Sequence, residues 1–127
     1  MAHPRMFDDA DPLLARVRVS CARLPQAVEF ESHGRPNFRA GSRQVFAVYG
    51  AGPDHPYALI LRIDPDDEAG LRADPRLFIP PYYPDRLALD LDAADIDWSE
   101  VDELLESSYR SVASRRMIRA LEGELQA

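Results

Sequence analysis

The fold is decided by residues 38–49, which read Phe-Arg-Ala-Gly-Ser-Arg-Gln-Val-Phe-Ala-Val-Tyr. The pair Gly41-Ser42 separates two stretches of strand-forming residues, Phe38–Ala40 and Arg43–Tyr49. Glycine followed by a small polar residue suits a two-residue type II′ turn, because the first central position of that turn has a positive φ. The segment therefore predicts an antiparallel β-hairpin.

Short strands are predicted on both sides of this hairpin. Residues 28–31 alternate apolar side chains with glutamates, and this period of two is typical of a half-buried strand. Residues 57–63 and 86–92 also place apolar side chains at alternate positions. Residues 77–79 lead into a proline-rich run at 80–84, which we expect to be an extended connection. The strands together predict an antiparallel meander.

Two helices are indicated by Asp-Pro pairs at residues 11–12 and 64–65. In each pair the aspartate suits the N-cap and the proline suits the first helical position. The first helix ends before Pro25, and the second is short, ending near residue 73. We expect apolar side chains of the first helix, spaced by three and four residues, to face the sheet.

A long C-terminal helix is predicted to begin at the sequence Asp-Trp-Ser-Glu, residues 97–100, which resembles a capping box. The pair Arg115-Arg116 marks a break or bend in it. The order of elements predicts a single α+β domain over residues 1–127. In this two-layer fold, an antiparallel sheet of about five strands carries the N- and C-terminal helices on one face.

Composition is that of a compact cytoplasmic protein. A chain of 127 residues with 46% hydrophobic residues can bury a core without disulfides. The single cysteine, Cys21, excludes an intramolecular disulfide and favours a reducing compartment. Residues 1–9 contain no apolar h-region, so we expect no secretory signal there, and the longest apolar stretch is too short to cross a bilayer. We expect a monomer that does not bind membranes.

Charge is unevenly distributed along the chain. The net charge is −7, and all 15 basic residues are arginines. Residues 54–108 hold four arginines and fifteen acidic residues, whereas the segments on either side each carry a net charge of +2. The middle of the chain is therefore an acidic block between two mildly basic ends.

The sequence around the hairpin resembles the MmcQ/YjbR family. Residues 32–49 read Ser-His-Gly-Arg-Pro-Asn-Phe-Arg-Ala-Gly-Ser-Arg-Gln-Val-Phe-Ala-Val-Tyr and are similar to the family block H-G-x-P-x-F-R-x-G-x-x-x-F-A. Residues 73–82, 89–92 and 96–109 are similar to later family segments in order and spacing. The resemblance implies a compact α+β fold with terminal helices around a five-stranded antiparallel sheet.

The resemblance also implies a function. Members of the family are commonly described as DNA-binding, with a double-wing contact surface, and no catalytic residues are established for them. Members often carry Gly-Trp before the last strand, where this sequence has Asp85-Arg86-Leu87. Any role of that aromatic residue is therefore missing here.

Two arginine clusters are candidates for nucleic-acid contact, because binding of the phosphate backbone requires concentrated positive charge. One surrounds the hairpin and the other lies near the C-terminus. They comprise Arg35, Arg39 and Arg43, and Arg110, Arg115, Arg116 and Arg119. We expect weak binding to duplex DNA if the clusters merge into one patch. The alternative is that these arginines are solvated and paired with the abundant carboxylates.

A ligand pocket is the second candidate site, and it would make the protein an adaptor for a small molecule or another protein. Aromatic side chains beside prolines form rigid apolar walls, and a histidine or arginine can orient a carboxylate. The candidate residues are His33, Phe38, Arg39, Tyr82 and Tyr83. In the alternative interpretation, the aromatic residues cap the core and His33 caps a turn.

Catalysis and metal binding have little support in the sequence. Cys21 lies on an apolar helical face, where a buried, unreactive thiol is expected. The acidic run at 64–68 lacks the residue order of an EF-hand, and the histidines have no metal-ligand spacing. The acidic residues at 90–97 have two interpretations: they form a solvated acidic edge, or they bind a cation at the surface. We expect a non-catalytic module without cofactor or metal.

Overall fold

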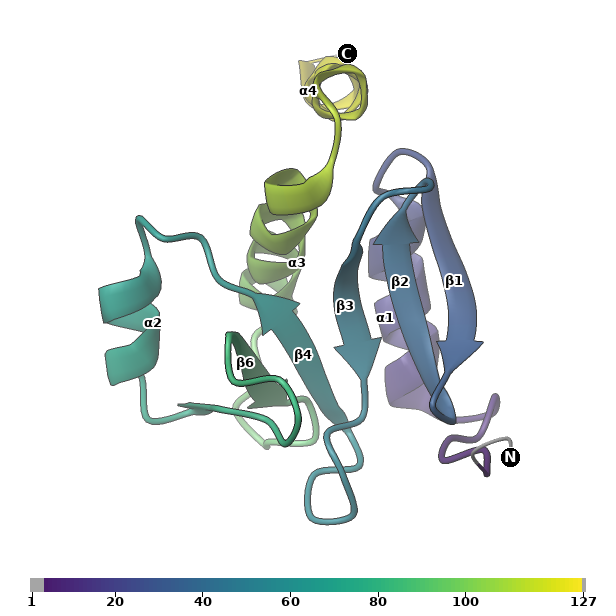
Figure 1. Ribbon diagram of the computed structural model, residues 1–127, viewed down its shortest axis with the longest axis vertical. Helices are drawn as coiled ribbons and strands as arrows, with labels where there is room; N and C mark the ends of the chain where they lie inside the picture. Colours follow the sequence, from purple (N-terminus) through teal and green to yellow (C-terminus); the bar gives the residue numbers. More distant parts are fainter. Residues whose placement is uncertain (1–3, 127) are drawn as a thin grey trace.

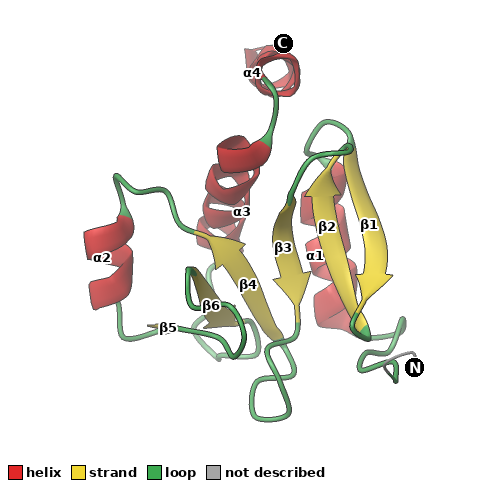
Figure 2. Cartoon of the chain, viewed as in Figure 1, coloured by secondary structure: helices red, strands yellow, loops and turns green. Residues whose placement is uncertain are grey.

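The structure is a computed structural model that describes residues 4–126, with side chains described through residue 123. The described residues form a six-stranded antiparallel sheet and four helices (Figures 1 and 2). In chain order the elements are α1 (Pro12–Ala22), β1 (Ala27–Ser32), β2 (Arg35–Ala40), β3 (Val45–Tyr49), β4 (Ala58–Arg62), α2 (Glu68–Ala73), β5 (Leu77–Phe78), β6 (Arg86–Asp90), α3 (Trp98–Val112) and α4 (Arg115–Gln126). Neighbouring strands follow the order β1-β2-β3-β4-β6-β5.

The predicted two-layer α+β fold is confirmed. Helices α1 and α3 lie behind the sheet in Figure 1, and α3 contacts β2, β3 and β4. Helix α2 stands at one side of the sheet, and α4 crosses above one end of it (Figure 1). The sheet has one strand more than expected, because Leu77 and Phe78 pair with Leu89 and Ala88 of β6.

The main core fills the space between the helices and the sheet. It contains the apolar stripes of α1 and α3, including Leu14, Val17, Val101 and Leu105, each at most 1% exposed. The hydroxyl of the fully buried Ser108 connects α3 to the sheet by donating to Phe46 O and accepting from the Arg62 N–H. Helices α1 and α3 therefore cover one face of the sheet and leave the opposite face without a helix.

A smaller apolar cluster covers part of that second face. Val48, Ile60 and Ala88 are buried there, and Phe78 and Tyr83 pack against them. The segment that contains β5 and the proline-rich connection thus shields β4 and β6. At the opposite edge of the sheet, Val28 of β1 remains 39% exposed, so the outer face of β1 stays open.

The predicted hairpin turn is present. Gly41 has a φ of 57°, and the Arg43 N–H donates to Ala40 O at 2.8 Å, as expected of a turn with glycine at its first central position. Strand β3 begins at Val45 instead of Arg43, and its register with β2 shifts between Phe38 and Arg39. The shift is a β-bulge, which twists the end of the hairpin.

The predicted starts of two of the three helices, α1 and α3, are confirmed. Asp11 and Asp97 are N-caps whose side chains accept the N–H of Leu13 and Ser99, each at 2.9 Å. Helix α2 was expected from residue 64 but begins at Glu68, because Asp64 accepts from the Asp66 N–H and closes a separate turn. Within residues 4–126, no helix is long and apolar enough to span a membrane.

Candidate nucleic-acid interface

The arginines fall into two groups by their partners. Eight form ion pairs with carboxylates, and these are Arg5, Arg16, Arg18, Arg23, Arg72, Arg76, Arg86 and Arg110. Among the side chains that the structure describes, the other seven form no such pair, and these are Arg35, Arg39, Arg43, Arg62, Arg115, Arg116 and Arg119. Of the seven arginines singled out from the sequence, Arg110 belongs to the first group because it pairs with Glu106 and Glu122, and the other six belong to the second.

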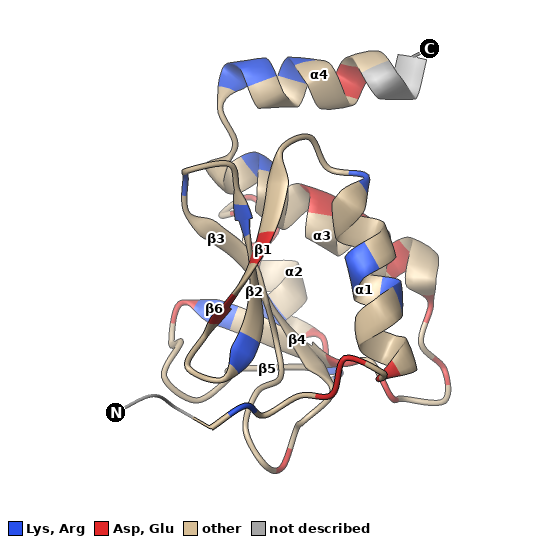
Figure 3. Cartoon of the chain, turned by 90° about the vertical axis from the view of Figure 1, so that its right-hand side faces the viewer, with Lys and Arg blue, Asp and Glu red and all other residues tan. Residues whose placement is uncertain are grey.

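The hairpin turn and α4 are in contact. The side chain of Met117, the third residue of α4, packs on the turn so closely that a Cβ added to Gly41 would lie 2.7 Å from Met117 Cε. Arg43 Nε donates to Val112 O, the last residue of α3. In Figure 3, the blue segments at the start of α4, in the β2–β3 turn and on upper β2 lie toward one side of the molecule.

The two sequence clusters therefore largely merge. We call Arg39, Arg43, Arg115, Arg116 and Arg119 the arginine surface. The last four are exposed. Arg43 lies at the carboxyl end of α3, where unpaired carbonyl groups and the helix dipole favour a cation. The Arg43 side chain is therefore oriented by a carbonyl group and not by an ion pair with a carboxylate.

Arg39 is held by an aromatic ring. Its Cζ lies 4.9 Å from the centre of the Phe30 ring, and Arg39 faces Val28 across the β1–β2 pair. The Nε atom is buried without a hydrogen-bond partner among the described residues. Because the guanidinium packs on a ring and not on an acid, its positive charge is not neutralised by a neighbour.

Arg35 is separated from the arginine surface. It lies at the start of β2, four residues before Arg39, a distance of about 13 Å along a strand. Its Nη1 donates to Gly50 O at 3.2 Å, at the opposite end of the sheet from α4. The structure thus divides the three hairpin arginines into a pair near α4 and a single residue at the other end.

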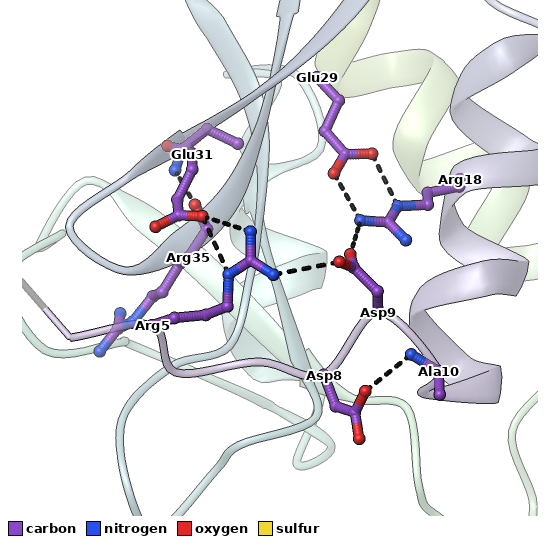
Figure 4. Close-up of polar contacts among 9 residues, drawn as sticks. Arg5, Asp8, Asp9, Ala10, Arg18, Glu29, Glu31 and Arg35 are labelled. Carbon is purple, nitrogen blue, oxygen red and sulfur yellow. Dashed lines mark hydrogen bonds and ion pairs between the residues drawn. The ribbon is translucent and has the colours of Figure 1, made fainter.

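The acidic residues of β1 are neutralised on the helical side of the sheet. Glu29 accepts two hydrogen bonds from Arg18 of α1, and Glu31 accepts two from Arg5 (Figure 4). Asp9 joins both arginines, and the Arg18 hydrogen bond holds the pKa of the Asp9 carboxyl below its usual value. Alternate residues of β1, including Phe30, face the open side, so these glutamates do not face Arg39.

The five residues predicted to form a ligand pocket do not come together. Phe38 is 2% exposed and belongs to the main core, whereas Arg39 points to the other face because neighbouring strand residues alternate. Tyr82 is 91% exposed, and Tyr83 packs on the smaller cluster beside β4 and β6. His33 is exposed in the β1–β2 turn, with its Nδ1 3.0 Å from Ser32 Oγ.

The structure also shows features that the sequence analysis missed. A cavity of about 570 Å³ lies beside the start of α1, and Tyr49, Tyr57 and Asp92 contribute to its walls. The Tyr49 hydroxyl donates to Asp11 at 2.5 Å, and burial together with this hydrogen bond raises the pKa of Tyr49. Tyr49 ends β3, whereas Tyr57 and Asp92 lie just outside β4 and β6, and no local pattern in the sequence marks them.

His55 and Asp90 form a second unforeseen pair. His55 Nδ1 lies 2.9 Å from Asp90 Oδ1, and the imidazole stacks on Phe78 with ring centres 4.1 Å apart. The antiparallel pairing of β4 with β6 places Asp90 opposite Ala58 and therefore next to His55. Only this long-range register could have revealed the contact.

Reactive groups outside these contacts are few among the described residues. Cys21 is 2% exposed, and burial raises the pKa of its thiol, so the nucleophilic thiolate is disfavoured. Among the side chains that the structure describes, no group of three or more from histidine, cysteine and acidic residues is arranged to hold a metal ion. The arginine surface is therefore the strongest candidate site in the described part of the chain.

Comparison with known proteins identifies the family of the chain. The model of the YjbR family matches residues 22–111, which run from the last residue of α1 almost to the end of α3. No curated protein and no solved structure matches the chain. The matched region contains β1 to β6, including the hairpin with Arg39 and Arg43, whereas α4 lies outside it.

Proposed function

We propose a nucleic-acid-binding function for this protein, which belongs to the YjbR family. The observation that carries the proposal is the arginine surface itself. Five arginines from β2, the β2–β3 turn and α4 gather at one end of the sheet, and none forms an ion pair with a described carboxylate. In a chain of net charge −7, unpaired arginines in one place indicate an anionic partner.

Phosphate groups fit this surface chemically. Arginine presents a planar fork of donors that matches two phosphate oxygens, and counterion release makes such contacts favourable. The overall negative charge opposes association only beyond the screening distance, about 8 Å at physiological ionic strength. We therefore expect contacts that are local, moderate in strength and sensitive to salt.

The same proposal describes the protein as a non-catalytic, monomeric module of the cytoplasm that needs no cofactor. A single buried cysteine suits a reducing compartment, and the structure brings together no nucleophile with an activating base among the described residues. The resemblance to DNA-binding members of the family supports the same class of partner.

The test is titration of a fluorescent duplex DNA at low and at physiological salt. Wild-type protein should bind measurably at low salt and lose most affinity near physiological salt. The variant Arg115→Glu with Arg116→Glu should bind at least tenfold more weakly at low salt, because it removes two phosphate contacts and adds two repulsive charges. Both side chains are exposed, so folding should be preserved.

A matched control is Arg72→Glu with Arg76→Glu. It changes the net charge by the same amount but removes arginines that are already paired with Glu68 and Asp74, near α2. We expect this control to retain most of the affinity. Equal losses in both double variants, or binding that ignores salt, would contradict a local arginine surface.

A further inference from the structure

The outer face of β1 and β2 is a partly apolar surface that includes Arg39 of the arginine surface. Helices α1 and α3 cover the opposite face of the sheet, and the segment with Phe78 and Tyr83 covers the β4–β6 side (Figure 1). Val28 remains 39% exposed, and Phe30 and Arg39 are half-buried. An open strand pair with an aromatic ring therefore lies directly next to unpaired positive charge.

The Arg39–Phe30 pair adds a planar group to this face. Cross-strand register places Val28 opposite Arg39, and Arg39 reaches along the sheet to Phe30, with Cζ 4.9 Å from the ring centre. Its terminal nitrogens form no hydrogen bond with a described residue and are not buried, so they are open to acceptors from outside. The guanidinium thus combines a stacking plane with free donors.

Such a plane suits an unpaired base. Sheets that bind single strands stack bases on aromatic rings and guanidinium planes, while nearby cations hold the phosphates. Bases in a duplex are already stacked on each other and present only their edges, so a guanidinium plane that could stack on a base has no partner there. Arg43 lies four residues after Arg39 and contacts the end of α3. The phosphates of a nucleic-acid strand whose base stacks on Arg39 would therefore find donors close by.

We propose that the arginine surface binds single-stranded nucleic acid, with one base stacked on the guanidinium of Arg39 where it lies over Phe30. This inference rests on the proposed function and specifies its ligand. The sugar-phosphate backbone of the bound nucleic acid runs from the open face of β2 toward the start of α4, where Arg115 and Arg116 contact its phosphates. Stacking is independent of sequence, because every base has a π-face.

The test compares three fluorescent probes of equal phosphate number: oligothymidylate, an abasic strand of the same length, and a duplex. Oligothymidylate should bind about 5- to 150-fold more tightly than the abasic strand, the range expected for one stacked base. It should also bind more tightly than the duplex. A fourth probe, oligouridylate, separates RNA from DNA, and tighter binding of either single strand than of the duplex supports the proposal.

Variants separate stacking from charge. Arg39→Lys keeps the positive charge but removes the plane, so it should abolish the preference for oligothymidylate over the abasic strand while leaving abasic binding nearly unchanged. Arg35→Lys is the matched control, because it is on the same strand but stacks on no ring that the structure describes. Phe30→Leu, which keeps an apolar side chain, should reduce the preference as Arg39→Lys does. Circular dichroism confirms that each variant is folded.

The outcomes distinguish this inference from the proposed function. Equal affinity for oligothymidylate and the abasic strand, tighter binding of the duplex, or an unchanged preference in Arg39→Lys would overturn the stacking proposal. In each of those cases the proposed function would still stand, provided that binding depends on salt and is weaker in the variant Arg115→Glu with Arg116→Glu. Failure to bind any of the four probes at low salt would reject both.

Discussion

Ser108 joins α3 to two strands at once. Its fully buried hydroxyl donates to Phe46 O at 2.5 Å and accepts from the Arg62 N–H at 2.9 Å. A hydroxyl is suited to this place because it can donate and accept at the same time. Ser108 lies on the buried side of α3, and its two partners lie on β3 and β4.

Replacing this hydroxyl tests its contribution to stability. Ser108→Ala should lower the free energy of unfolding by about 1–3 kcal/mol, because it leaves a buried N–H and a buried C=O without that partner. Urea titration measures the change. The control is Ser111→Ala on the exposed side of the same helix, with an expected change below about 0.5 kcal/mol. Similar losses in both variants would show that the hydroxyl of Ser108 is not important.

A second residue, Asp74, should make the free energy of unfolding depend on pH in the acidic range. Arg76 donates to Asp74 from its side chain, at 2.7 Å, and from its backbone N–H, at 2.9 Å, and these bonds lower the pKa of Asp74 to about 2. Because this pKa lies below the ordinary value of 3.8, the charged form stabilises the folded state. That stabilisation is present above about pH 4 and is lost as the pH falls toward 2.

The measurement compares wild type with Asp74→Asn by urea unfolding between pH 6 and pH 2. The stability difference between the two proteins should be constant above about pH 5 and shrink as the pH falls through the range between the two pKa values. Asp54→Asn, in the exposed loop between β3 and β4, serves as the control. A difference for Asp74→Asn that does not change with pH would contradict the lowered pKa.

At the scale of elements, the contact between the β2–β3 turn and α4 builds the arginine surface. Gly41 takes a φ of 57°, which L-residues rarely adopt, and Met117 packs against it. The turn therefore needs glycine for two reasons, its backbone conformation and the close approach of a side chain. This contact and the hydrogen bond from Arg43 to Val112 O place the turn next to the start of α4, which carries Arg115 and Arg116.

Gly41→Ala should destabilise the protein by about 1–2 kcal/mol, mainly through the strained backbone, since the end of the Met117 side chain can move aside. The control is Gly70→Ala in α2, where nothing lies within 4 Å of the added Cβ and φ is not positive. There alanine should stabilise the helix by up to about 1 kcal/mol. Thermal unfolding of both variants checks the opposite signs, and destabilisation by both would contradict this account of Gly41.

At the scale of the whole molecule, the region matched by the family model and the charged surface do not coincide. The family region ends at residue 111, whereas three arginines of the arginine surface lie on α4. Helix α4 contributes two buried side chains, Met117 and Leu121, to the core that the structure describes. It adds more to the charge of the surface than to the packing of the fold.

Removing residues 114–127 should therefore separate stability from binding. The shortened protein should remain folded but unfold at lower urea, because two apolar side chains, worth about 1.5–3 kcal/mol each, are no longer buried. Its affinity for nucleic acid should fall at least as much as that of Arg115→Glu with Arg116→Glu. Circular dichroism and the duplex titration measure the two effects, and unchanged affinity would place the interface elsewhere.

The fold class and most element ends follow from the sequence alone, because they depend on near neighbours. The caps at Asp11 and Asp97, the turn at Gly41 and the break at Arg115 are each encoded within a few residues. Alternation along β2 already implied that Phe38 and Arg39 face opposite sides, although the pocket hypothesis grouped them.

Only the tertiary structure decided which arginines share a surface. Arg43 meets the end of α3 and lies beside α4, and Arg39 stacks on Phe30, while Arg35 stays at the far end of its strand. The pairing of His55 with Asp90 is of the same kind. These contacts join residues distant in the chain, so they depend on strand register and helix docking, which the whole core determines and no short stretch of sequence encodes.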